Sequence, residues 1–169
     1  MLKIKFLILL SSILGIVSCG ITIEDRSIYK SVKYSVDHLS GGQNAFIFKN
    51  VLTQQLIANN LFDEDSEMAI SITMEEKKEY LSTSITKVAS RKLNELSVEI
   101  ETYQKNNITC IYLNNKYESR QSFLLAESSA NLSNDAAQSE ILLINSENIA
   151  IRIIDDLQSL REKECLNLE

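Results

Sequence analysis

The segment that decides the fold is residues 141–161, ILLINSENIAIRIIDDLQSLR, near the C-terminal end of the chain. Its apolar residues recur at steps of three and four, which places them along one stripe of an α-helix. The stripe consists of Leu143, Ala150, Ile153, Leu157 and Leu160. We therefore predict one helix over residues 133–161, about 40 Å long at 1.5 Å per residue.

Four upstream segments alternate apolar and polar residues, the period of two that is typical of half-buried strands. They are residues 32–36, 68–74, 96–100 and 108–123. The polar stretch 75–94 is interpreted as strand continuation through a hairpin, and QKNN at 104–107 as a turn. In the fourth segment, one face is expected to carry Ile108, Cys110 and Tyr112, and the other Tyr117, Ser119 and Gln121.

A glycine-containing turn, SGGQN at residues 40–44, ends the first strand. Asn44 is expected to cap a helix behind it. The apolar positions of that helix are Ala45, Phe48, Leu52 and Leu56. The element order is then strand, helix, three strands, helix. Two helices can cover the apolar face of a four-stranded, mostly antiparallel sheet, so the sequence predicts an α+β two-layer sandwich.

The first 18 residues have the organisation of an export signal. Lys3 and Lys5 give a basic start, and the apolar run at 6–17 is too short for a bilayer span, which needs about 20 residues. Small residues, Gly15 and Ser18, stand near its end. The alternative is a buried core segment, but the three features occurring together favour a cleaved leader.

Ile16-Val17-Ser18-Cys19 resembles a bacterial lipobox. This resemblance implies cleavage before Cys19, a diacylglycerol on its sulfur and an acyl group such as palmitate on its new amino group, with no other cofactor. Several acyl chains anchor a protein far more strongly than one. The absence of Asp after Cys19 indicates the outer membrane of a Gram-negative cell, with the domain facing the periplasm. The predicted organisation is a signal peptide at 1–18, a lipidated tether at 19–30, one domain at 31–161 and a charged tail at 162–169.

Composition argues against several classes of function. A net charge of −6 disfavours broad nucleic-acid binding. The single histidine, His38, has no nearby Cys or His, and no nucleophile-elbow motif is present. The acidic segment at 63–67 lacks the Gly and Glu that a calcium loop needs at its sixth and twelfth positions, where Met68 and Met74 stand. We therefore expect neither catalysis nor a metal site.

Two cysteines remain beyond the lipid attachment site, Cys110 and Cys165. An exported protein can join them in a disulfide. Their spacing alone leaves this pairing and two unpaired thiols both open.

A group of cations surrounds the predicted hairpin. Arg91 and Lys92 stand at the entry to the third strand, with Lys87 just before them and Lys77-Lys78 across the hairpin. On paired strands these side chains can converge on an anionic head group, for which Arg is suited by its bidentate binding of phosphate. The alternative is ordinary edge-strand charge that discourages aggregation.

The whole pattern resembles the LPS-assembly lipoproteins of the LptE type. Beyond the lipobox, the resemblance rests on SRKLNELSVEIETYQ at 90–104, SRQSFLLAES at 119–128 and NIAIRIIDDLQSL at 148–160. It implies a non-catalytic outer-membrane lipoprotein that plugs a large β-barrel of the LptD type, assists its assembly and helps insert lipopolysaccharide into the outer leaflet. It also implies that Arg91, with Lys92 as the second candidate, contacts lipopolysaccharide. The alternative is another periplasm-facing lipoprotein, a binding or envelope-stabilising module without a barrel partner.

Overall fold

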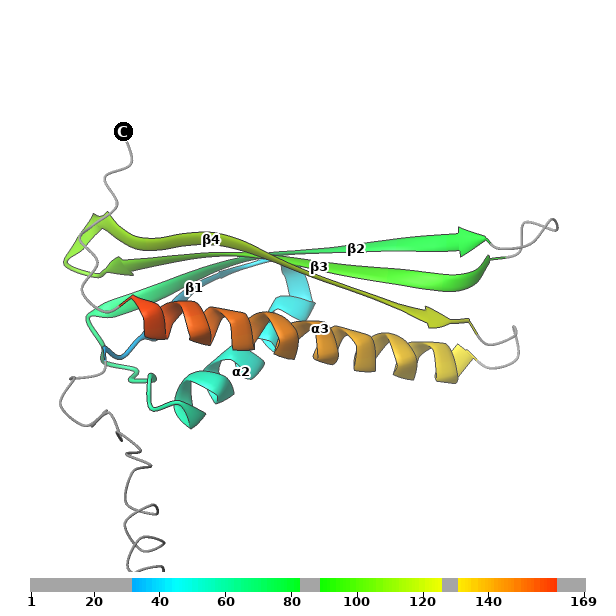
Figure 1. Ribbon diagram of the computed structural model, residues 1–169, viewed down its shortest axis with the longest axis horizontal. Coiled ribbons are helices and arrows are strands. Elements are labelled where there is room, and N and C mark those ends of the chain that lie inside the picture. Colours follow the sequence, from blue (N-terminus) through cyan, green and yellow to red (C-terminus); the bar gives the residue numbers. More distant parts are fainter. Residues whose placement is uncertain (1–31, 83–88, 126–130, 161–169) are drawn as a thin grey trace, which may run out of the picture. The chain divides into compact units, whose positions relative to one another are not determined.

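Two helices cover one face of a four-stranded sheet in the computed structural model of the protein, which describes residues 32–82, 89–125 and 131–160 (Figure 1). The elements are β1 (Ser35–Ser40), α2 (Gly42–Ala58), β2 (Met68–Ser82), β3 (Ala89–Gln104), β4 (Asn107–Leu124) and α3 (Asn131–Ser159). The strands lie side by side in sequence order. β1 pairs parallel with β2, and the other neighbours pair antiparallel. The predicted α+β class and element order are confirmed.

The first strand begins later than its alternating pattern predicted. Residues 32–36 were expected to form it, whereas β1 starts at Ser35. The backbone of Tyr34 is paired elsewhere: its N–H donates to the Leu61 oxygen at 2.7 Å, and its oxygen accepts from the Asp63 N–H at 3.1 Å. The loop after α2 therefore holds Tyr34, which is buried at the edge of the sheet.

The turn between β1 and α2 requires glycine. Gly41 has a φ of 128°, and a Cβ at this position would overlap the carbonyl oxygen of Met74. The predicted Asn44 cap is wrong, because α2 already begins at Gly42 and no side chain caps it. The Asn44 amide instead donates to the carboxylate of Glu76 on the sheet, at 2.8 Å.

A bulge in β4 reverses the predicted faces of that strand. Thr102 pairs with Leu113 while Tyr103 pairs with Ile111, so Tyr112 is an additional residue. One extra residue exchanges the two faces of a strand beyond it. Tyr117 is consequently buried on the same face as Cys110, whereas the regular alternation placed them on opposite faces.

The apolar core lies between the helices and the end of the sheet that both helices cover. We call this region the core half. Its strand residues include Ile70, Ile72, Met74, Leu96, Val98 and Ile100, and its helix residues include Phe48, Leu52, Leu56, Ile149, Ile153 and Leu157. The helix predicted over residues 133–161 is α3, Asn131–Ser159, so Leu160 of the predicted stripe is buried just after the helix. The stripe is wrong at Leu143, which is 42% exposed. Leu142 is buried instead, since it stands seven residues before Ile149 and so shares its face.

The opposite end of the sheet extends beyond α2 (Figure 1). This sheet tip comprises residues 77–82 of β2, 89–93 of β3 and 120–124 of β4, and it runs along the first turns of α3, residues 131–141. None of the described side chains in these four segments is buried. The tip is therefore a surface region built on strands that the core half holds in place.

Candidate functional site

Arg91 lies on the face of the sheet that the helices leave uncovered. Successive side chains of a strand point to opposite faces, and the buried residues of β3 have even numbers, so Arg91 points away from the helices. It pairs with Leu81 of β2 and Leu124 of β4, which are 38% and 70% exposed. An exposed guanidinium thus stands between two exposed leucines.

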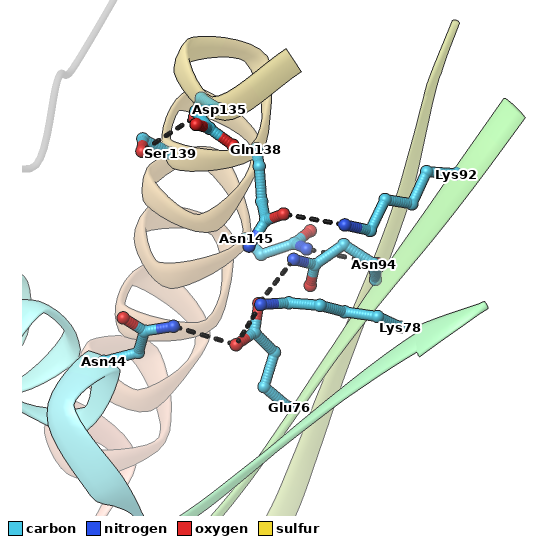
Figure 2. A network of polar contacts seen from close by, with 9 residues as sticks. All are labelled: Asn44, Glu76, Lys78, Lys92, Asn94, Asp135, Gln138, Ser139 and Asn145. Atoms are coloured by element: carbon cyan, nitrogen blue, oxygen red, sulfur yellow. Dashed lines mark hydrogen bonds and ion pairs between the residues drawn. The ribbon is translucent and has the colours of Figure 1, made fainter. Parts of the chain in front are cut away.

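Lys92 lies on the opposite, helix-facing side of the same strand. Its ammonium donates to the Gln138 side-chain oxygen on α3 at 2.8 Å and lies 5.2 Å from the centre of the Tyr80 ring (Figure 2 shows the contact with Gln138). The two candidate lipid-binding residues are therefore separated by the sheet itself. They do not form one cluster, although the sequence places them next to each other.

The other cations of the hairpin are engaged with carboxylates. Lys77 pairs with Glu79 at 2.7 Å, and this hydrogen bond raises the pKa of Lys77 and lowers that of Glu79. Lys78 pairs with Glu76 at 3.1 Å on the helix-facing side. Lys87 lies outside the described residues. The predicted convergence of these cations with Arg91 is not observed in the part of the chain that the structure describes.

Arg91 differs from its neighbours on the uncovered face in having no ion pair with a described carboxylate. Lys77, Lys116 and Arg120 on that face each pair with a glutamate. Lys77 and Lys116 pair with a glutamate two residues along their own strand, and Arg120 pairs with Glu95 across the sheet. Arg91 has leucines as its cross-strand partners, and the residues two positions away on β3 are Ala89 and Leu93, so none of these positions offers it a carboxylate. Its charge therefore remains available to an anion from outside.

A polar cluster, in which Asn94 and Asn145 are fully buried, separates the sheet tip from the core half, and Figure 2 shows all of its members except Ser119. It consists of Asn44, Glu76, Asn94, Ser119 and Asn145. Glu76, whose side chain is 12% exposed, accepts hydrogen bonds from Asn44 at 2.8 Å and from Asn94 at 2.7 Å. Ser119 donates to the Asn145 oxygen at 2.8 Å, and the Asn145 amide reaches the Asn94 backbone oxygen at 3.4 Å. Both helices are thus joined to the sheet at this level.

A second polar contact joins β4 to α3 away from the tip. The Tyr117 hydroxyl donates to Asp156 at 2.5 Å, and Arg152 lies 5.3 Å from the Tyr117 ring centre. Arg152 also donates to the Glu118 backbone oxygen at 2.9 Å. Burial, with the hydrogen bond to Asp156, raises the pKa of Tyr117. These contacts fix the position of α3 against the sheet.

The cysteines and the single histidine remain to be placed in the structure. Cys19 lies outside the described residues, as does Cys165. Cys110 is disulfide-bonded and buried, so it is not a free thiol. His38 is exposed on β1. The described residues contain neither a cluster of three metal-binding side chains nor a helix long and apolar enough to cross a membrane.

Sequence reasoning missed the neighbours of the two cations. Leu81 and Leu124 flank Arg91, and Tyr80 and Gln138 contact Lys92. Leu81 and Leu124 stand at the ends of their strands, and that position was their only signal in the sequence. Their meeting beside Arg91 depends on the pairing register of three strands.

No protein-family model and no curated protein sequence matches the chain. Solved lipoprotein structures share its fold. A minor lipoprotein from Acinetobacter baumannii is 15% identical with a TM-score of 0.62, covering 80% of this chain and 97% of its own. Rare lipoprotein B from Shewanella oneidensis is 16% identical with a TM-score of 0.55, covering 75% and 94%. An uncharacterized lipoprotein B from Nitrosomonas europaea is 12% identical with a TM-score of 0.57, covering 76% and 83%. At these identities the likeness establishes the fold.

Proposed function

We propose that the protein is a non-catalytic lipoprotein of the outer membrane that plugs and helps assemble a β-barrel translocon for lipopolysaccharide. It would also help to insert lipopolysaccharide into the outer leaflet. Anchoring is assigned to lipid on Cys19, in line with the export signal and lipobox ahead of it. The solved structures that share its fold are themselves lipoproteins, which supports a role in the cell envelope.

The arrangement around Arg91 is the single observation that carries the lipid-binding part of the proposal. A guanidinium without a described carboxylate partner binds phosphate bidentately. The exposed leucines on both sides, Leu81 and Leu124, offer apolar surface to the hydrocarbon of the same molecule. A lipid whose head group carries phosphate matches both features, whereas a free phosphate would leave the leucines unused.

The rest of the uncovered face supports a location in a hydrated, polar lumen. This face carries ion pairs such as Lys116 with Glu118, and Arg120 with Glu95 at the border of the sheet tip. Ion-paired side chains of this kind are well solvated. The interior of a large membrane β-barrel is likewise polar, so the two surfaces are compatible.

Co-purification tests the partner. The full-length, tagged lipoprotein is extracted from its native membrane in mild detergent, and the bound proteins are identified by mass spectrometry. We expect a large outer-membrane barrel protein in about equimolar amount. Recovery of the lipoprotein without any barrel protein would refute the plug and would favour a binding or envelope-stabilising lipoprotein.

Charge reversal tests the lipid contact. Arg91→Glu should weaken binding of lipopolysaccharide to the detergent-solubilised protein by about tenfold or more, since a hydrogen bond to a charged group contributes about 1.5–3 kcal/mol. Lys116→Glu is the matched control, because it makes the same charge change on the same face away from the tip. Equal affinity of the Arg91 variant and the wild type would remove Arg91 from the site.

A further inference from the structure

A pocket of about 410 Å³ lies between the sheet tip and the first turns of α3. It is lined by Tyr80, Lys92, Phe123, Leu125, Asn134, Asp135 and Gln138. Its volume is at the small end of the range for small-molecule sites, which is about 300–1,000 Å³. The pocket opens on the helix-facing side of the sheet and is therefore distinct from the surface around Arg91.

Two aromatic rings form the sheet side of this pocket. Tyr80 and Phe123 are the cross-strand partners of Lys92 on its two sides, so the three residues form one rung across β2, β3 and β4. Tyr80 is 65% exposed although α3 passes over this face. The described part of α3 at this level, residues 134–141, contributes no buried side chain. The Tyr80 side chain thus remains accessible to a ligand, with the Lys92 ammonium beside its ring.

Opposite charges line the same pocket without neutralising each other. The Lys92 ammonium uses one hydrogen bond on Gln138, and the described residues include no ion pair between Lys92 and Asp135. An ammonium donates hydrogen bonds and a carboxylate accepts them. A ligand that satisfies both must carry an anionic acceptor and hydroxyl donors, together with an apolar face for the rings.

We propose that this pocket binds a phosphorylated sugar, with the phosphate on Lys92, ring hydroxyls on Gln138 and Asp135, and the C–H face of the sugar against Tyr80. This assignment rests on the proposed function to the extent that the sugar and phosphate belong to the lipopolysaccharide head group. The sugar then occupies the helix-facing side of the tip while Arg91 engages the lipid on the other side.

The lining excludes two simpler ligands. An acyl chain in the pocket would remove Lys92 and Asp135 from water without giving them polar partners, which is costly. Inorganic phosphate would use Lys92 but would leave Asp135, Gln138 and the aromatic rings without a role. The combination of rings, amide, cation and carboxylate fits a sugar phosphate better than either.

Saturation-transfer difference NMR on the full-length protein in detergent micelles tests the proposal, with glucose 1-phosphate, glucose and inorganic phosphate as probes. We expect saturation of the glucose 1-phosphate ring protons, and glucose should give a weaker signal. Tyr80→Ala and Gln138→Ala should each reduce the signal at least fivefold. Lys116→Ala should leave the signal unchanged.

Three results would overturn the pocket assignment: no saturation of glucose 1-phosphate, full displacement of it by equimolar inorganic phosphate, or equal signals from wild type and both pocket variants. Because Tyr80 is largely exposed, its variant is expected to keep the wild-type circular dichroism spectrum. The experiments distinguish a failure of the proposed function from a failure of the pocket assignment. Loss of the co-purifying barrel protein, with intact sugar binding, refutes the plug alone, whereas a present barrel without sugar binding refutes the pocket alone.

Discussion

The core half and the sheet tip are built on the same three long strands, yet they differ in almost every physical property. In the core half, helix-facing positions of β2 and β3 hold residues such as Ile72, Val98 and Ile100, and both helices cover them. At the tip, the same face holds Lys78, Tyr80 and Lys92, and only α3 passes over it. A change of side chains along one strand is thus enough to turn a stable core into an accessible surface.

The boundary between the two regions is the polar cluster around Glu76. A buried carboxylate with hydrogen-bond partners from α2 and β3 marks the level at which apolar packing stops. Beyond it, the strands keep their hydrogen-bonded ladder but lose their core. We therefore expect the core half to provide most of the folding stability and the sheet tip to provide the contacts with ligands. The following experiments test this expectation.

The largest effect is expected from removing core packing. Ile100→Ala should lower the free energy of unfolding by about 2–5 kcal/mol, because Ile100 is fully buried and its truncation leaves a cavity. Leu124→Ala at the tip should cost less than about 0.5 kcal/mol, as is usual for exposed positions. Urea unfolding followed by circular dichroism measures both. Similar losses for the two variants would abolish the distinction between the regions.

Opening the polar cluster should have the next largest effect. Glu76→Ala removes the acceptor of the Asn44 and Asn94 amides and should cost about 1–3 kcal/mol, since buried donors are left unsatisfied. Glu75→Ala is the matched control, because Glu75 is exposed on the other face of the same strand. If both variants unfold at the same urea concentration, the cluster contributes nothing to holding the helices.

The core half should also respond to alkaline pH. Burial raises the pKa of Tyr34 from 10.0 to about 12 and raises that of Tyr117. Between pH 10 and pH 12, the tyrosines of the unfolded state have released phenolic protons that Tyr34 in the folded state still holds. The free energy of unfolding therefore falls as the pH rises from 10 toward 12, and the stability that these groups contribute is fully present below pH 10.

For Tyr34 the loss should be up to about 2 kcal/mol at pH 12, given 1.36 kcal/mol per pKa unit. Urea unfolding at pH 9 and pH 11.5 measures it. Tyr34→Phe should show a smaller decrease between the two pH values than the wild type. An identical decrease in the variant would mean that Tyr34 does not cause the alkaline loss.

The smallest global effect is expected where α3 meets the tip. Gln138→Ala removes its hydrogen bond with Lys92 and should cost less than about 1 kcal/mol, since the contact is only part-buried. Amide hydrogen exchange in residues 134–141 should nevertheless become faster, while residues 149–157 keep their protection, because local opening involves few buried contacts. Equal protection of both segments in the wild type would show that α3 is held uniformly.

Several details escaped sequence reasoning for identifiable reasons. The cap assigned to Asn44 failed because α2 already begins at Gly42, so Asn44 lies within its first turn and its side-chain amide is free to donate to Glu76 on the sheet. The faces of β4 were reversed after Tyr112 because a single-residue bulge leaves no mark in an alternating pattern. Leu142 and Leu143 are adjacent leucines at the margin of one helical stripe, and only the position of α3 on the sheet decides which of them is buried.

The candidate site, too, was only partly predictable from the sequence. The sequence drew attention to a group of cations near the hairpin, but it treated Arg91 and Lys92 as members of one cluster. Strand geometry places them on opposite faces, and the pairing register then gives Arg91 two leucines and Lys92 two aromatic rings. The pocket beside Lys92 needs α3 as well, so no local pattern contains it.

The number, order and type of the described elements could be predicted from the sequence, because apolar periodicities of two and 3.6 are local properties of strands and helices. The positions of the charged residues near the hairpin could be read from it as well. The parallel pairing of β1, the separation of core half from sheet tip, and the partners of Arg91 and Lys92 became evident only in the folded protein. These features depend on contacts between residues far apart in the chain. Burial and pairing register result from the packing of the whole sheet against its helices.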